Sequence, residues 1–149
     1  CEKRVPNSFT AVQKKQICTT DSSSSGTIST SIGPAVCASV AKQLLHLKFD
    51  LVLELCQGAS SSAPVQCMTQ LDVQSKNKYG VELCKGAVST LPGECFAEVS
   101  AFPGTKNKVK PELLLPFCVS LEDRAPLLCL HAVKESGLLP LHQAVDICG

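Results

Sequence analysis

Residues 56–67 read CQGASSSAPVQC, residues 84–95 read CKGAVSTLPGEC, and residues 118–129 read CVSLEDRAPLLC. Each segment begins and ends with Cys and carries Pro three positions before its second Cys. The first two segments also share Gly-Ala at their third and fourth positions. Three copies with the same spacing indicate a repeated structural unit, and this repeat decides the fold.

Altered copies extend the pattern toward both ends of the chain. The segment from Cys18 to Cys37 is longer, but Pro34 again lies three positions before its second Cys. A partial copy occupies residues 147–149. A large apolar residue precedes the first Cys of every copy: Ile17, Leu55, Leu83, Phe117 and Ile147. We predict a single domain of about five units and expect it to be a fragment of a larger protein. The approximate units are residues 1–30, 31–60, 61–89, 90–122 and 123–149.

Each Pro-x-x-Cys sequence predicts the start of a helix, because Pro fits the first turn, where its missing N–H would have no partner. Ser62, Thr90 and Asp123 lie two or three positions before a Pro, and we expect them to cap the free N–H groups. A second helix is predicted at the first Cys of each copy. The predicted second helices span residues 9–17, 51–56, 81–84, 113–118 and 141–148. The fold class is therefore all-α, with disulfide-linked helical hairpins stacked as a short α-solenoid or a compact helical disc.

The ten cysteines indicate a disulfide framework, since so many are rare in a reducing compartment. In an antiparallel hairpin the start of the first helix lies beside the end of the second, which favours pairing within a unit. This scheme predicts the bridges Cys1–Cys18, Cys37–Cys56, Cys67–Cys84, Cys95–Cys118 and Cys129–Cys148. The alternative joins neighbouring units, for example Cys56 to Cys67, and leaves Cys1 and Cys148 at opposite ends.

The composition argues against several classes of function. A formal net charge of +1 gives no general attraction for nucleic acid. No apolar run reaches the length of a membrane-spanning helix, so we expect a chain that does not span a membrane. The closest cysteines are eleven positions apart, whereas zinc sites use ligands two to four apart. We therefore predict no metal, no cofactor and no nucleic-acid partner.

The sequence also lacks a recognisable catalytic constellation. A nucleophilic Cys needs a free thiolate, and the repeat assigns every Cys to a pair. The Gly-x-Ser-x-Gly nucleophile motif does not occur. We interpret His46, His131 and His142 as packing residues, with His46 partly buried on a helix. The expectation is a protein without catalytic residues.

Lysines recur in the predicted turns between the two helices of a unit. Lys76 and Lys78 lie in one such turn, and Lys106, Lys108 and Lys110 lie in the next. Stacked units would align these side chains into a basic ridge suited to an acidic protein or a sulfated glycan. The alternative interpretation is that the lysines only keep solvated loops soluble.

Repeats, paired cysteines and missing catalytic motifs together predict a non-enzymatic module of a secreted or cell-surface protein, in an extracellular, oxidising compartment. Its expected role is binding, adhesion or scaffolding. The expected partner is a protein or a glycan, or neighbouring repeats of the same parent chain. The alternative is a carrier of lipid or another small apolar ligand. The aliphatic composition and the mean hydropathy of +0.16 motivate this alternative.

Overall fold

The computed structural model of the chain describes residues 3, 5–19, 33–72, 78–102, 111–119 and 121–149. Within these segments the protein contains nine α-helices and no β-strand. The helices are α1 (Ala11–Thr19), α2 (Gly33–Leu44), α3 (Phe49–Cys56), α4 (Ala63–Thr69), α5 (Lys78–Cys84), α6 (Leu91–Ser100), α7 (Pro111–Val119), α8 (Ala125–Ser136) and α9 (Leu141–Cys148). The predicted all-α class is therefore confirmed.

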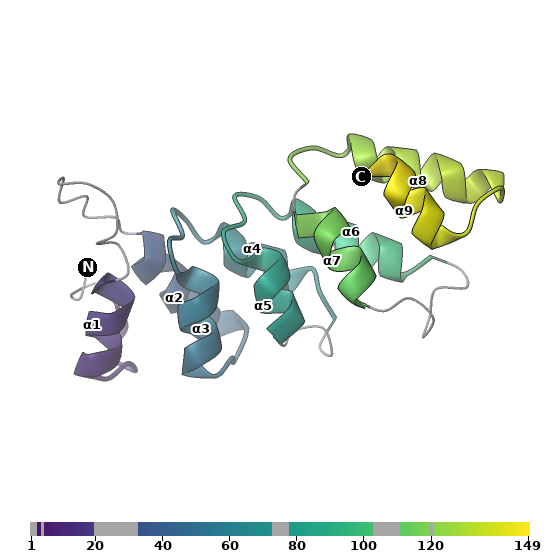
Figure 1. Cartoon of the computed structure of the whole chain (residues 1–149). Helices are drawn as coiled ribbons and strands as arrows, with labels where there is room; N and C mark the ends of the chain where they lie inside the picture. Colours follow the sequence, from purple (N-terminus) through teal and green to yellow (C-terminus); the bar gives the residue numbers. More distant parts are fainter. Residues whose placement is uncertain (1–2, 4, 20–32, 73–77, 103–110, 120) are drawn as a thin grey trace.

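The helices pack as consecutive pairs that follow one another in a row (Figure 1). α2 packs against α3, α4 against α5, α6 against α7, and α8 against α9. Between pairs, α4 contacts both α2 and α6, while α5 contacts both α3 and α7. First helices therefore pack on first helices and second helices on second helices, in two layers. This arrangement is compatible with the predicted stack of hairpins.

The helices α4, α6 and α8 begin in the same way, one residue before the Pro of the repeat. In each case the side-chain oxygen three residues before the Pro accepts a hydrogen bond from the first backbone N–H of the helix. The donor–acceptor distances are 3.1 Å from Ala63 N to Ser61 Oγ, 3.3 Å from Leu91 N to Ser89 Oγ, and 2.7 Å from Ala125 N to Asp123 Oδ1. This shared acceptor satisfies one of the N–H groups that a helix start leaves free.

The predicted cap at Asp123 is thus confirmed, whereas those at Ser62 and Thr90 are wrong. Neither of these two side chains makes a capping hydrogen bond. Their backbones lie close to the helical region, with φ −84° and ψ 5° at Ser62 and φ −80° and ψ −11° at Thr90. A capping residue normally has an extended backbone that turns its side chain toward the helix, so the acceptor lies one residue earlier.

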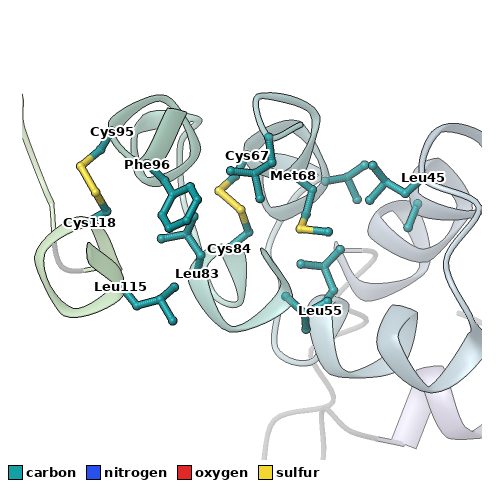
Figure 2. Close-up of a cluster of buried hydrophobic side chains, with 14 of the residues drawn as sticks. Leu45, Leu55, Cys67, Met68, Leu83, Cys84, Cys95, Phe96, Leu115 and Cys118 are labelled. Carbon is teal, nitrogen blue, oxygen red and sulfur yellow. A yellow bond between two sulfur atoms is a disulfide. The ribbon is translucent and has the colours of Figure 1, made fainter. Parts of the chain in front are cut away.

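The hydrophobic core lies between the two layers and runs through the stack. Figure 2 shows Leu55, Met68 and Leu83 packed between the layers, beside the Cys67–Cys84 bridge. These three side chains are at most 2% exposed. Full burial of such a side chain stabilises a fold by about 1.5–3 kcal/mol. The core is mainly aliphatic, with the cystines as part of it.

Two glycines allow close approach of backbone segments: Gly33 lies against the loop that leaves its own hairpin, and Gly93 lies against the hairpin before it. A Cβ atom at Gly33 would lie 2.0 Å from the carbonyl oxygen of Ala59, and one at Gly93 would lie 2.2 Å from that of Cys67. Real side chains do not reach such distances, so any larger residue would push the contacting segments apart. The absence of a side chain at Gly93 therefore sets the spacing between the hairpins α4–α5 and α6–α7.

The predicted environment of His46 is wrong. α2 ends at Leu44, and His46 lies beyond it with a left-handed backbone, at φ 50°, and an exposed side chain. Leu45, the first residue after α2, is 9% exposed and belongs to the core. The helix therefore ends before His46, and the imidazole is exposed to solvent.

Candidate functional site

Four disulfides lie within the described residues, and each joins the first helix of a hairpin to the second. They are Cys37–Cys56, Cys67–Cys84, Cys95–Cys118 and Cys129–Cys148. These pairs follow the scheme within a unit, and Cys56 and Cys67 are not joined to each other. In the remaining predicted pair, Cys18 is disulfide-bonded and Cys1 lies outside the described residues. Intramolecular disulfides of this kind are consistent with an oxidising compartment.

A groove of about 490 Å³ opens between the loop after α5 and the segment after α7. We call it the loop groove. Its lining residues are Leu83, Lys85, Gly86, Ala87, Val88, Ser89, Pro92, Val119, Leu121 and Glu122. The volume lies within the range of pockets that take small ligands or single side chains of a partner.

The loop groove is lined by apolar side chains that are exposed to solvent. Val88 is 85% exposed and Val119 is 44% exposed. Gly86 lies two residues after the end of α5 and has a left-handed backbone at φ 74°, and the Ala87 N–H donates to the Cys84 carbonyl oxygen at 3.0 Å. This tight turn directs the following residue, Val88, away from the core.

Both exposed valines occupy positions that are polar in the other copies of the repeat. The counterparts of Val88 are Ser60 and Glu122, and the counterparts of Val119 are Gln57 and Lys85. Val88 and Val119 thus stand in place of polar residues, and both of them line the same groove. Lys85 and Glu122 also line it, so opposite charges flank the apolar surface.

A second, smaller groove lies between α4 and α6. Its volume is about 400 Å³, and its lining residues are Gln70, Leu71, Asp72, Phe96, Ala97, Ser100 and Ala101. The large apolar residues at this site, Leu71 and Phe96, are already buried, at 4% and 6% exposure. This groove therefore offers less apolar surface to a ligand than the loop groove does.

Most of the predicted basic ridge lies outside the described residues. This applies to Lys76, Lys106, Lys108 and Lys110, while Lys78 begins α5 with an exposed side chain. The ridge therefore stays a prediction.

A polar cluster that the sequence did not reveal joins α6 to α8. The Arg124 guanidinium pairs with Glu98 and lies 3.5 Å from Glu94, and His131 Nε2 lies 3.2 Å from Glu98 Oε2. The His131 ring also meets Phe102 edge-on, with 4.8 Å between ring centroids. We call Glu94, Glu98, Arg124 and His131 the polar junction. His142 takes no part in it and is exposed on α9.

The polar junction was not predictable from spacing, because Glu98 lies 26 residues from Arg124 and 33 from His131. The sequence interpretation of His131 as a packing residue captured its contact with Phe102 and missed its carboxylate partner. Only the way in which α8 packs beside α6 brings these side chains together.

Comparison of the chain with protein families, curated proteins and solved structures finds no match. Among the described residues, no group of three His, Cys, Asp or Glu side chains is placed to hold a metal ion. No helix in the described segments is long and apolar enough to cross a bilayer, since the longest, α2 and α8, have 12 residues. Of the two grooves described, the loop groove presents more exposed apolar surface.

Proposed function

We propose that this chain is a non-enzymatic binding module of a secreted or cell-surface protein, and that the loop groove takes an apolar side chain of a protein partner. The observation that carries the proposal is the pair of exposed valines, Val88 and Val119, at positions that are polar in the other copies. A large aliphatic side chain in water is disfavoured, so an apolar residue at a solvated loop position suggests a partner.

The geometry of the loop groove suits a single anchor residue of the partner. Binding energy at protein interfaces is concentrated in a few apolar side chains that enter pockets of the partner surface. Pro92 and Leu83 supply apolar walls, while Lys85 and Glu122 can orient polar groups beside the anchor. The groove joins two hairpins held by buried disulfides, so a partner would meet a surface that is largely preformed.

The proposed location rests on the disulfides. Four bridges within the described residues would not persist in a reducing cytosol. A secreted or cell-surface protein meets the oxidising conditions that such bridges require.

The lipid-carrier alternative needs an apolar cavity inside the molecule. Leu55, Met68 and Leu83 fill the space between the layers where the stack is best described, and both grooves described above lie at the surface. These observations favour binding at the surface over enclosure of a lipid. A lipid retained at one copy per chain in native mass spectrometry would reverse this preference.

The proposal is tested by screening the intact chain against an arrayed panel of extracellular domains with surface plasmon resonance. We expect a binder whose affinity falls at least about tenfold when Val88→Asp places a charge in the groove. Val12→Asp is the matched control, because Val12 is 68% exposed on the distant α1. If every binder tolerates Val88→Asp, or if the panel yields none, the proposal is wrong.

A further inference from the structure

The loop groove contains two charged side chains whose places in the repeat correspond to those of its two valines. Lys85 and Val119 each directly follow the Cys of a second helix, while Val88 and Glu122 each lie four positions after it. All four residues line the groove. Each of the two loops therefore contributes one valine and one charge, in opposite order along the chain.

The two loops are fixed by the same hydrogen bonds at both ends. The Leu121 N–H donates to the Cys118 carbonyl oxygen at 3.5 Å, as the Ala87 N–H does to Cys84. At the other end, the acceptor three residues before the Pro ties each loop to the helix that follows. The loops start from the neighbouring helices α5 and α7 at the same edge of the row (Figure 1). The position after the Cys therefore marks one end of the groove, and the fourth position marks the other.

Both charges of the loop groove are available to a partner. Lys85 and Glu122 are exposed, and the ion pairs among the described residues join Arg124 and His131 to the glutamates of α6 instead. The two charged residues that follow Glu122 are already engaged, since Asp123 caps α8 and Arg124 belongs to the polar junction. The groove thus carries one cation and one anion at different ends of an apolar surface.

We propose that the loop groove binds a protein segment in which an aliphatic anchor residue lies between an acidic and a basic residue. This inference rests on the proposed function and adds the charge pattern of the partner to it. The anchor in the apolar groove supplies most of the affinity, whereas charges at the rim select the partner and its orientation. Lys85 attracts the acidic residue, and Glu122 attracts the basic one.

The opposite signs of the two charges select this occupant over others. A nucleic acid or an anionic lipid surface presents negative charge alone, which suits Lys85 but is repelled by Glu122. A segment with two acidic or two basic residues beside the anchor likewise places one of them against a like charge. A protein segment can carry both signs within a few residues, as the groove requires.

Selection of random peptides displayed on phage against the intact, oxidised chain tests the inference. We expect the enriched peptides to carry an aliphatic residue between an acidic and a basic residue. Fluorescence anisotropy of the labelled peptides should show affinity that falls about tenfold with Lys85→Glu or with Glu122→Lys. New selections should give two basic flanking residues with Lys85→Glu and two acidic ones with Glu122→Lys.

Lys78→Glu is the matched control for these variants. It makes the same change of charge as Lys85→Glu, but Lys78 is exposed at the first residue of α5, at the other end of that helix. It should leave both the affinity and the selected peptides unchanged. Far-UV circular dichroism and the mass of the non-reduced chain verify that every variant is folded and bridged.

Three results would overturn this inference: no enriched peptide, peptides without a charge preference beside the anchor, or peptides whose affinity withstands both charge reversals. Val88→Asp separates the inference from the proposed function, which the panel of extracellular domains tests independently. A panel binder that Val88→Asp weakens and both charge reversals leave intact would retain the loop groove as the binding site and remove only the charge pattern. Selected peptides that tolerate Val88→Asp bind elsewhere and count against the inference.

Discussion

The hairpin α4–α5 and the hairpin α8–α9 are built from the same sequence unit but differ in how their residues are covered. Cys67 and Cys84 are fully buried in the former, whereas Cys129 and Cys148 are half-exposed in the latter. Leu83 and Ile147 occupy matching positions, yet they are 2% and 65% exposed. Burial in this repeat is thus decided by the neighbouring hairpin rather than by the residue itself.

The two hairpins also differ in how they are joined to the rest of the stack. The first helices α4 and α6 meet at backbone distance, where Gly93 lies against Cys67. Between α6 and α8 the polar junction supplies charged contacts through Glu98, Arg124 and His131. Since exposed ion pairs contribute little free energy, the last hairpin is expected to be the less firmly attached one.

The largest expected effect comes from reducing the disulfides. Each described bridge joins residues 17 to 23 positions apart, and such a loop stabilises a fold by about 3 kcal/mol. Helices of 12 residues or fewer are marginal in water without such support. We expect full reduction to abolish most of the far-UV helical signal.

Graded reduction separates the two hairpins. A thiolate reagent reaches an exposed bridge first, so Cys129–Cys148 should open before Cys67–Cys84. Alkylation followed by peptide mass spectrometry measures the order, and a sample in denaturant serves as the control, where all bridges should react alike. Unchanged helicity and melting temperature after complete reduction would contradict the role given to the bridges.

A smaller effect is expected from truncating the matched pair of apolar residues. Leu83→Ala should lower the free energy of unfolding by about 2–5 kcal/mol, because it leaves a cavity in the core. Ile147→Ala should change it by less than about 0.5 kcal/mol, because the side chain is mostly in water. Urea denaturation followed by circular dichroism measures both values.

The urea experiment is done at a protein concentration at which the unaltered chain is monomeric, so that any contact between copies does not contribute. A large loss for Ile147→Ala under that condition would mean that another part of the same chain covers Ile147. The comparison between the inner and last hairpins would then fail.

The fold was largely predictable because its main signals are local. Pro64, Pro92 and Pro126 mark the first turns of α4, α6 and α8, and α9 spans its predicted residues 141–148. Other boundaries moved by one to three residues: α5 begins at Lys78 rather than at Val81. Helix ends depend on packing and on the turn that follows, which periodicity alone does not define.

The caps show where the sequence pattern was insufficient. Ser61 and Ser62 are both serines, and sequence alone does not say which one accepts the hydrogen bond. The position of Asp123, three residues before its Pro, indicates the acceptor in the other copies, because the same offset selects Ser61 and Ser89. The shared register of the repeat is therefore more informative than the preference of one residue type.

The surface features depend on contacts between units and were the least predictable. Ile147 occupies a position that is apolar in every copy, and only the surroundings of this position expose the side chain. Alignment of the copies did contain a signal for the loop groove, since Val88 and Val119 replace polar residues. The polar junction had no such signal.

The smallest expected effect concerns the polar junction. Glu98→Gln removes the charge that faces Arg124 and His131, and Arg124→Ala removes the guanidinium. Arg124 is 53% exposed and Glu98 is 35% exposed, so solvent screens the pair. Each variant should therefore lower the free energy of unfolding by at most about 1 kcal/mol. The double variant should lower the free energy of unfolding by less than the sum of the two single changes. The difference, the coupling energy, should be about 0.5 kcal/mol, as for an exposed ion pair.

The coupling energy should shrink as salt is raised from about 0.05 to about 1 M, because ions screen exposed charges over a few ångströms at the higher concentration. Lys134→Ala is a suitable control, since it removes a charge from α8 outside the polar junction. A coupling energy of several kcal/mol that resists salt would show that the last hairpin is held as firmly as the inner ones.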